Sequence, residues 1–220
     1  MTSAPLIGTH PRRRAWAWLL VGSMGLAGCG SLLPKPPAQP TLFLIADVFI
    51  DPGDGPLRPA AATATATLVV GETRAAPGYG TRRIAYVRAQ DQLEYFAFSQ
   101  WVEPPAVMLA PLLAHAAERT GAFRAVVRAP LSVAGDVRLE TELVRLQQDF
   151  STTPSRVRLT LRAVLIETAT RRVLATREFE AHAPSASEDP AGGVSAANQA
   201  AHRVAAEVGA FCAESIGKSK

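Results

Sequence analysis

The residue types that most often carry catalysis or hold metals are few in this chain and widely spaced. Its histidines, at positions 10, 115, 182 and 202, lack the paired spacing of a metal site or of a Ser-His-Asp triad. The sequence has no phosphate-binding loop, no Gly-x-Ser-x-Gly elbow and no paired-cysteine metal motif. The segment 78–80, Gly-Tyr-Gly, lacks the third glycine of a dinucleotide site and is interpreted as a turn. We therefore predict that the protein is not an enzyme and has no catalytic residues and no metal ligands.

Cys29 is the one residue whose neighbours specify a chemistry. Three arginines at 12–14 precede an uncharged apolar run over 15–27, and Leu-Ala-Gly at 26–28 leads directly into Cys29. A span of a bilayer needs about 20 apolar residues, so this shorter run has the layout of a secretory signal. An ordinary signal peptidase could also cut after the small residues 27 and 28. Cysteine directly after Leu-Ala-Gly resembles the bacterial lipobox, which predicts cleavage between Gly28 and Cys29.

A lipobox cysteine receives a diacylglycerol on its thiol and a third acyl chain on its new amino terminus. The thiolate is a better nucleophile than a hydroxyl, which explains why this position is Cys and not Ser. Each buried methylene contributes about 0.8 kcal/mol, so several chains, with palmitate expected among them, hold the protein durably. We expect this lipid on Cys29 and no other cofactor. Gly30 stands where Asp would signal inner-membrane retention in enteric bacteria, so we predict the periplasmic face of the outer membrane.

The charge of the chain and its second cysteine exclude two other classes of protein. Removal of residues 1–28 leaves 20 basic against 19 acidic residues, so the chain lacks the surplus of basic charge typical of nucleic-acid-binding proteins, and we expect no nucleic-acid partner. Only two cysteines are present, and if Cys29 carries lipid, Cys212 has no partner for a disulfide. Cys212 lies on the apolar stripe of an expected helix and is interpreted as a buried structural thiol.

The composition of the chain divides it into three parts. Residues 1–28 are the predicted lipoprotein signal peptide. Residues 29–40 contain the lipidated cysteine and a proline-rich spacer, which in the polyproline II conformation would extend about 3.1 Å per residue. Residues 41–217 have the length and apolar content of a single domain.

Alternation and turn residues predict strands along most of this domain. The expected strands cover 41–48, 64–70, 83–88, 93–98, 123–128, 137–146, 156–167 and 172–182. The loop at 75–80 separates the second and third of these, and the short segment between 88 and 93 suits a hairpin. In the strand 156–167, Val and Leu alternate with Arg158, Thr160 and Arg162, so we expect one face of the sheet to be wet.

Two segments change to helical spacing. Between 104 and 120 the apolar positions fall on one stripe, with Gly121 as a cap, and Pro111 predicts either a kink or a start near residue 110. From 194 to 212 an alanine-rich stripe follows Asp189 and Pro190, which would begin the helix. The fold predicted is α+β, a mainly antiparallel sheet with two principal helices packed on one face.

Several short motifs, in this order and spacing, resemble the ABC-type transport auxiliary lipoprotein family. They are the lipobox, APGY at 76–79, RIAY at 83–86, LEYFAFSQWVEPP at 93–105, GAF at 121–123, LQQDF at 146–150 and RRVLA at 171–175. The resemblance covers nearly the whole mature chain. The tyrosine-containing strand that runs into Trp-Val-Glu-Pro-Pro is its most specific part.

This resemblance implies a non-enzymatic component of a lipid transport system. In such systems an ABC permease and its ATPase supply the energy and an MCE-domain protein forms a tunnel across the periplasm. The lipoprotein is expected to dock or receive that tunnel at the outer membrane, and copies tethered near one tunnel favour a homo-oligomer.

Three aromatic residues are the candidates for contact with a partner. Tyr86, Tyr95 and Trp101 are of the types enriched in interface hot spots. Trp101 could instead close the core where strand meets helix. Two other functions stay open: an envelope lipoprotein that regulates or stabilises a cell-wall or other envelope complex, and direct carriage of lipid, which needs an apolar cavity.

Overall fold

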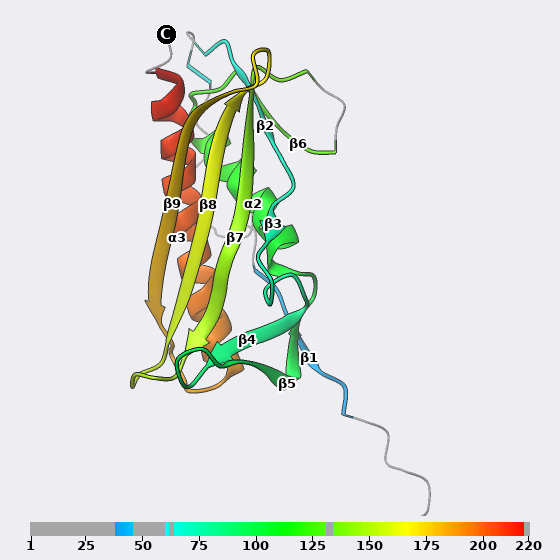
Figure 1. Cartoon of the computed structure of the whole chain (residues 1–220), viewed down its shortest axis with the longest axis vertical. Coiled ribbons are helices and arrows are strands. Elements are labelled where there is room, and N and C mark those ends of the chain that lie inside the picture. Colours follow the sequence, from blue (N-terminus) through cyan, green and yellow to red (C-terminus); the bar gives the residue numbers. More distant parts are fainter. Residues whose placement is uncertain (1–37, 46–59, 62–63, 131–133, 218–220) are drawn as a thin grey trace, which may run out of the picture. The chain divides into compact units, whose positions relative to one another are not determined.

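The computed structural model describes residues 38–45, 60–61, 64–130 and 134–217, and from Gln39 onward the chain forms one compact unit. Cys29 and Gly28, together with the predicted leader and most of the spacer, lie outside the described residues. The described residues form a mixed sheet, mainly antiparallel, and two helices, which confirms the predicted α+β class (Figure 1).

Three long strands form an antiparallel group. They are β7 (Val137–Asp149), β8 (Arg156–Glu167) and β9 (Arg172–Pro184). Leu143, Leu161 and Phe179 lie opposite one another across the three strands, and all three side chains are buried. The alternation in the sequence predicted these strands, although β7 and β9 extend beyond 146 and 182.

The other edge of β7 pairs with a series of short parallel strands. In chain order β2 (Thr67–Val70), β3 (Arg74–Ala75) and β4 (Arg83–Val87) each pair with a successive part of β7. Beyond them, β4 forms the predicted hairpin with β5 (Leu93–Trp101), β5 pairs with β1 (Thr41–Phe43), and β2 pairs with β6 (Ala125–Arg128).

The expected strand limits needed correction at several of these short strands. Of the predicted strand 41–48, only Thr41–Phe43 is extended, and residues 46–48 lie outside the described part. The strands predicted at 64–70 and 123–128 begin at Thr67 and Ala125, while that at 93–98 continues to Trp101. The loop expected at 75–80 includes one residue of β3.

Both helices cover one face of the sheet, as predicted (Figure 1). The longer helix, α3 (Pro190–Gly217), lies along β8 and β9 and places its alanine-rich stripe in the core. The Asp189 carboxylate accepts a hydrogen bond from the Gly192 amide at 2.8 Å, so Asp189 caps the start of this helix. The shorter helix, α2 (Pro105–Arg119), packs against α3 and against β6.

The shorter helix begins at Pro105 and continues through Pro111. Of the two alternatives predicted for it, the start near residue 110 was therefore wrong, whereas a kink at Pro111 stays a prediction. Pro105 occupies the first turn, where a missing amide hydrogen costs no helical hydrogen bond. At the other end Gly121 has a φ of +66° and donates to the Glu118 carbonyl at 3.0 Å, which confirms the predicted cap.

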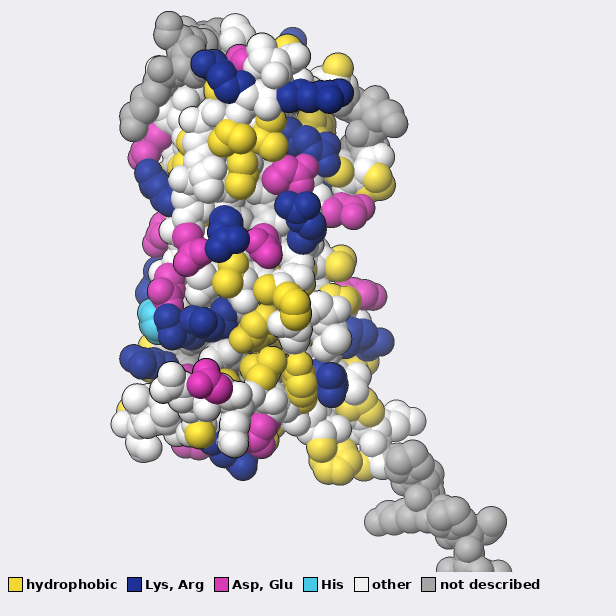
Figure 2. Space-filling model, viewed as in Figure 1, with side chains coloured by type: hydrophobic (Ala, Val, Ile, Leu, Met, Phe, Trp, Pro, Cys, Tyr) yellow, Lys and Arg dark blue, Asp and Glu magenta, His cyan; other side chains and the backbone are white. Residues whose placement is uncertain are grey.

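The face of the sheet opposite the helices carries interleaved charges (Figure 2). Arg162 of β8 contacts Glu142 of β7 at 3.0 Å and Glu178 of β9 at 3.2 Å, and Arg158 pairs with Glu180. Exposed pairs of this kind contribute little stability individually, but they fix which face points outward. Thr160 departs from the expected wet face, because its side chain is buried.

Candidate functional site

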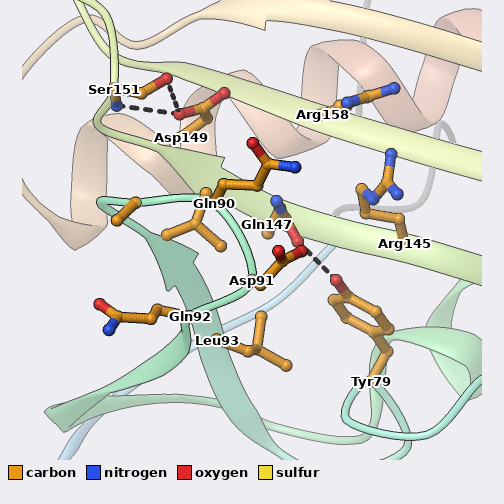
Figure 3. A pocket seen from close by; sticks show the side chains of 12 residues that line it. Tyr79, Gln90, Asp91, Gln92, Leu93, Arg145, Gln147, Asp149, Ser151 and Arg158 are labelled. Carbon is orange, nitrogen blue, oxygen red and sulfur yellow. Dashed lines mark hydrogen bonds between the residues drawn. The ribbon is translucent and has the colours of Figure 1, made fainter.

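A polar hollow of about 700 Å³ lies on this outer face, where the β4–β5 hairpin meets β7 and β8 (Figure 3). One wall is the hairpin loop 88–92, and the opposite wall is formed by Arg145, Gln147 and Asp149 of β7 with Arg158 of β8. Tyr79, from the loop between β3 and β4, closes one side. Four segments far apart in the sequence therefore meet here.

A bulge in β7 turns three polar side chains toward this hollow. Up to Leu143, the odd-numbered residues of β7 are buried, whereas beyond it Leu146 and Gln148 are buried. The pairing with β8 shifts between Leu143 and Arg145, so the strand contains one additional residue at this point. A bulge of this kind exchanges the two faces of the strand that follows it. Arg145, Gln147 and Asp149 consequently lie on the outer face.

Some charged groups of the hollow have an ion-pair or hydrogen-bond partner, and others form no ion pair with a described residue. Arg158 pairs with Glu180, and the hydrogen bond from Arg158 is the main reason that the pKa of Glu180 is lowered. Burial alone would raise the pKa of Asp149, but hydrogen bonds from Ser151 and the charge of Arg156 outweigh burial and lower it. Arg145 forms no ion pair with any carboxylate that the structure describes.

Tyr79 lies beside Arg145 and holds the Gln147 side chain in place. Its hydroxyl donates a hydrogen bond to the Gln147 side-chain oxygen. Burial raises the pKa of Tyr79, and the positive charge and hydrogen bond of Arg145 offset part of this rise. The phenol therefore stays neutral near pH 7 and serves as a hydrogen-bonding group, not as a base.

The arrangement suits binding better than catalysis. Its side chains supply cations, amides and carboxylates, and although the Ser151 hydroxyl donates to the Asp149 carboxylate at 2.6 Å, no described histidine lines the hollow to act as a general base. Within the described residues, no group of three or more His, Cys, Asp or Glu could hold a metal ion. His182 lies on the outer face next to Glu180, whereas His115 and His202 line a smaller hollow of about 340 Å³ between α2 and α3.

The predicted contact residues lie on the two strands of the β4–β5 hairpin, Tyr86 on β4 and Tyr95 and Trp101 on β5. Trp101 is only 3% exposed and packs in the core, which is the second of its two proposed roles. Tyr86 is 8% exposed and packs on Phe96. Its hydroxyl donates a hydrogen bond to Glu94 at 2.8 Å, and this bond raises the pKa of Tyr86. Tyr95 is half-buried, lies under the Arg83 guanidinium and donates to the Gly78 carbonyl at 2.9 Å.

The structure does not gather these three aromatic residues into one exposed patch. Whether they contact a partner stays a prediction. The large apolar side chain that β5 does expose is Phe98, at 64%.

Cys212 is buried in the core, as expected for a structural thiol. Burial raises its pKa from 9.0 to about 12. Because only the thiolate reacts, we expect alkylation of Cys212 in the folded protein to be about a thousandfold slower than in the unfolded chain. Iodoacetamide labelling of a Cys29→Ser chain, with and without urea, measures this difference. Rapid stoichiometric labelling of the folded chain would contradict it.

Sequence reasoning did not identify Tyr79, Asp91, Arg145 and Arg158 as residues of one site, although it placed Arg158 on the wet face of its strand. One signal was present in β7: the run Leu143-Val144-Arg145-Leu146 interrupts the strict alternation and marks the bulge. No pattern along the chain indicated that Tyr79 and the hairpin loop would close over this strand.

Comparison with known proteins places the chain in a family. The sequence profile of the ABC-type transport auxiliary lipoprotein component matches residues 51–209. A search among curated proteins finds no match. Protein XCC0632 from Xanthomonas campestris is similar in structure, with a TM-score of 0.70 and 23% identity, over 81% of this chain and 98% of that one.

A second solved structure, of an uncharacterized protein, has a TM-score of 0.60 and 12% identity, over 79% of this chain and 99% of that one. At these identities the two structures support the fold alone. Among the described helices, none combines the length and the apolar character that crossing a membrane requires. The match over 51–209 includes the β4–β5 hairpin, the three long strands, all of α2 and most of α3. The chain therefore belongs to the family of ABC-type transport auxiliary lipoprotein components.

Proposed function

We propose that this protein is a non-catalytic, lipid-anchored periplasmic component of an ABC/MCE-type lipid transport system. Its role is to dock or receive the MCE-domain tunnel at the outer membrane. The family match over residues 51–209 carries this proposal, because the family is an auxiliary lipoprotein component of ABC-type transport. The lipobox before Cys29 supports it independently, since it would attach the domain to a membrane without a membrane-spanning helix.

A binding role also agrees with the construction of the domain. The two helices leave one broad face of the sheet uncovered, and the hollow on that face gathers cations, amides and carboxylates. A proline-rich spacer of about 10 residues would let such a domain reach a partner roughly 30 Å from its anchor. Several copies around one tunnel would bind more strongly than a single copy, which is why we include a homo-oligomer in the proposal.

Exposed apolar side chains on β1, directly after β1 and on β5 are the best candidates for the contact with the MCE-domain protein. Phe98 is 64% exposed, Leu42 is 52% exposed and Leu44 is 49% exposed. Residues 41–43 pair with 99–101 in parallel, so Leu42 lies on the same face of the sheet as Gln100 and Phe98. Figure 2 shows hydrophobic side chains gathered over this corner, where β1 and β5 lie. Apolar groups of this size contribute most when a partner excludes water from them.

We expect Phe98→Gln to weaken binding of the MCE-domain protein by about tenfold. The measurement is copurification, followed by surface-immobilised binding, of this lipoprotein with the MCE-domain protein from the same bacterium. Val173→Gln is the matched control, because Val173 is 54% exposed on β9, away from this corner. Unchanged binding by Phe98→Gln would rule out this contact surface, and absence of any association between the two wild-type proteins would overturn the proposed function.

A further inference from the structure

The outer-face hollow contains two opposite charges that the described residues leave without an ion pair. Arg145 projects from β7 and forms no ion pair with a described carboxylate, although its charge helps to lower the pKa of Glu180, and Asp91 projects from the hairpin loop and forms no ion pair with a described cation. The other charges of the hollow are occupied, since Arg158 pairs with Glu180 and Asp149 is held by Ser151 and Arg156. A ligand would therefore meet one cation and one anion that form no ion pair with a described residue, with the paired Arg158 as a second cation lining the same hollow.

Backbone geometry holds these two groups on opposite walls. Asp91 adopts a φ of +64° within a turn in which the Gln92 amide donates to the Ala89 carbonyl at 3.4 Å. Aspartate tolerates this left-handed conformation better than most residues, and it places the carboxylate on the loop over the hollow (Figure 3). The bulge at Leu143–Arg145 places the guanidinium on the sheet wall. Neither group depends on a long flexible segment for its position.

The sheet wall is suited to a phosphate group. Arg145 offers a fork of donors, and the Arg158 guanidinium lines the same hollow and adds positive charge. The Tyr79 hydroxyl lies next to Arg145 and adds a polar group to the same wall. The loop wall differs, because the Asp91 carboxylate would repel a simple anion and attract an ammonium group.

We propose that this hollow binds a small zwitterion in which a phosphate and an ammonium group are linked by a short chain, as in phosphoethanolamine. The phosphate lies against Arg145 and Arg158, and the ammonium lies against Asp91. A volume of about 700 Å³ is ample for such a group and falls within the usual range of small-molecule sites. The same chemistry occurs in a free metabolite and in a phospholipid headgroup, and it is independent of whether the protein docks an MCE-domain partner.

Isothermal titration of the purified lipoprotein in a maltoside detergent tests this site. We expect O-phosphoethanolamine to bind saturably and about tenfold more tightly than either inorganic phosphate or ethanolamine. Arg145→Gln should weaken phosphoethanolamine about tenfold, and Asp91→Asn should remove its advantage over inorganic phosphate. Arg162→Gln is the control, because Arg162 lies on the same outer face but pairs with Glu142 and Glu178 outside the hollow.

Two further results separate the outcomes. Competition by dihexanoyl phosphatidylethanolamine at the same site would identify a lipid headgroup as the source, whereas binding of O-phosphoethanolamine alone would identify a soluble zwitterion. Circular dichroism spectra and melting temperatures of the variants should match those of the wild type, since both side chains are on the surface. The site is overturned if phosphoethanolamine gives no saturable heat, or if Arg162→Gln weakens it as much as Arg145→Gln.

Discussion

We expect Cys29→Ser to abolish acylation and durable membrane attachment completely. A serine hydroxyl is a much weaker nucleophile than a thiolate, so the variant should receive no diacylglycerol. Each methylene that enters the bilayer contributes about 0.8 kcal/mol to the free energy of membrane binding. Loss of the acyl chains removes all of this contribution, and with it the predicted anchor. Cells grown with radiolabelled palmitate should label the wild-type protein and leave the variant unlabelled.

Cys212→Ala serves as the control for this experiment, because it removes the other cysteine of the chain without touching the leader. It should be labelled as strongly as the wild type. Terminal sequencing of the wild-type protein should place the cut between Gly28 and Cys29, and Cys29→Ser should not be cut there. A palmitate-labelled Cys29→Ser protein, or one processed at the same bond, would show that the anchor lies elsewhere.

The elements that the sequence predicted best are those whose pattern is local. The alternation of Val157, Leu159 and Leu161 with charged neighbours requires a strand with one buried face, and β8 begins and ends at the expected residues. The stripe that runs through Val204, Val208 and Phe211 requires a helix with one buried side. In both, the chemistry of one segment decides its structure.

The pairing of β2, β3 and β4 with β7 was beyond such reasoning. A strand has the same period of two whether its neighbour is parallel or antiparallel, so alternation indicates no partner. Thr160 shows a related effect, since it occupies an outward position of β8 but is buried. It lies opposite Arg145 and Glu180, on strands whose long side chains share that face.

The candidate site was hidden for the same reason. Tyr79, Asp91, Arg145 and Arg158 come from four segments, and only the parallel pairing of β4 with β7 brings the hairpin loop over the bulge. Each residue taken alone has an ordinary role as a surface charge or a turn residue. The candidate site therefore depends on a tertiary arrangement that no motif encodes, whereas the predicted anchor depends on four consecutive residues.

The contact between the two helices depends on one glycine. Gly209 of α3 is buried against the backbone of α2, where an added methyl group would lie 2.6 Å from the Ala116 carbonyl oxygen and 2.9 Å from its carbon. These are backbone atoms within a helix, so they cannot rotate aside as a side chain could. The absence of a side chain at Gly209 is what lets the helices approach so closely.

We therefore expect Gly209→Ala to lower the free energy of unfolding by about 1–3 kcal/mol, as overpacking does in other cores. The sign of this change is informative, because in a helix without steric contacts alanine is more favourable than glycine by about 1 kcal/mol and would raise the stability. Gly217→Ala is the control, since a methyl group there meets no atom within 4 Å and should leave stability unchanged or slightly raised. Urea unfolding of the two variants measures both effects. If Gly209→Ala stabilised the protein as much as its helix preference predicts, the two helices could not be packed at the distance that the fold requires.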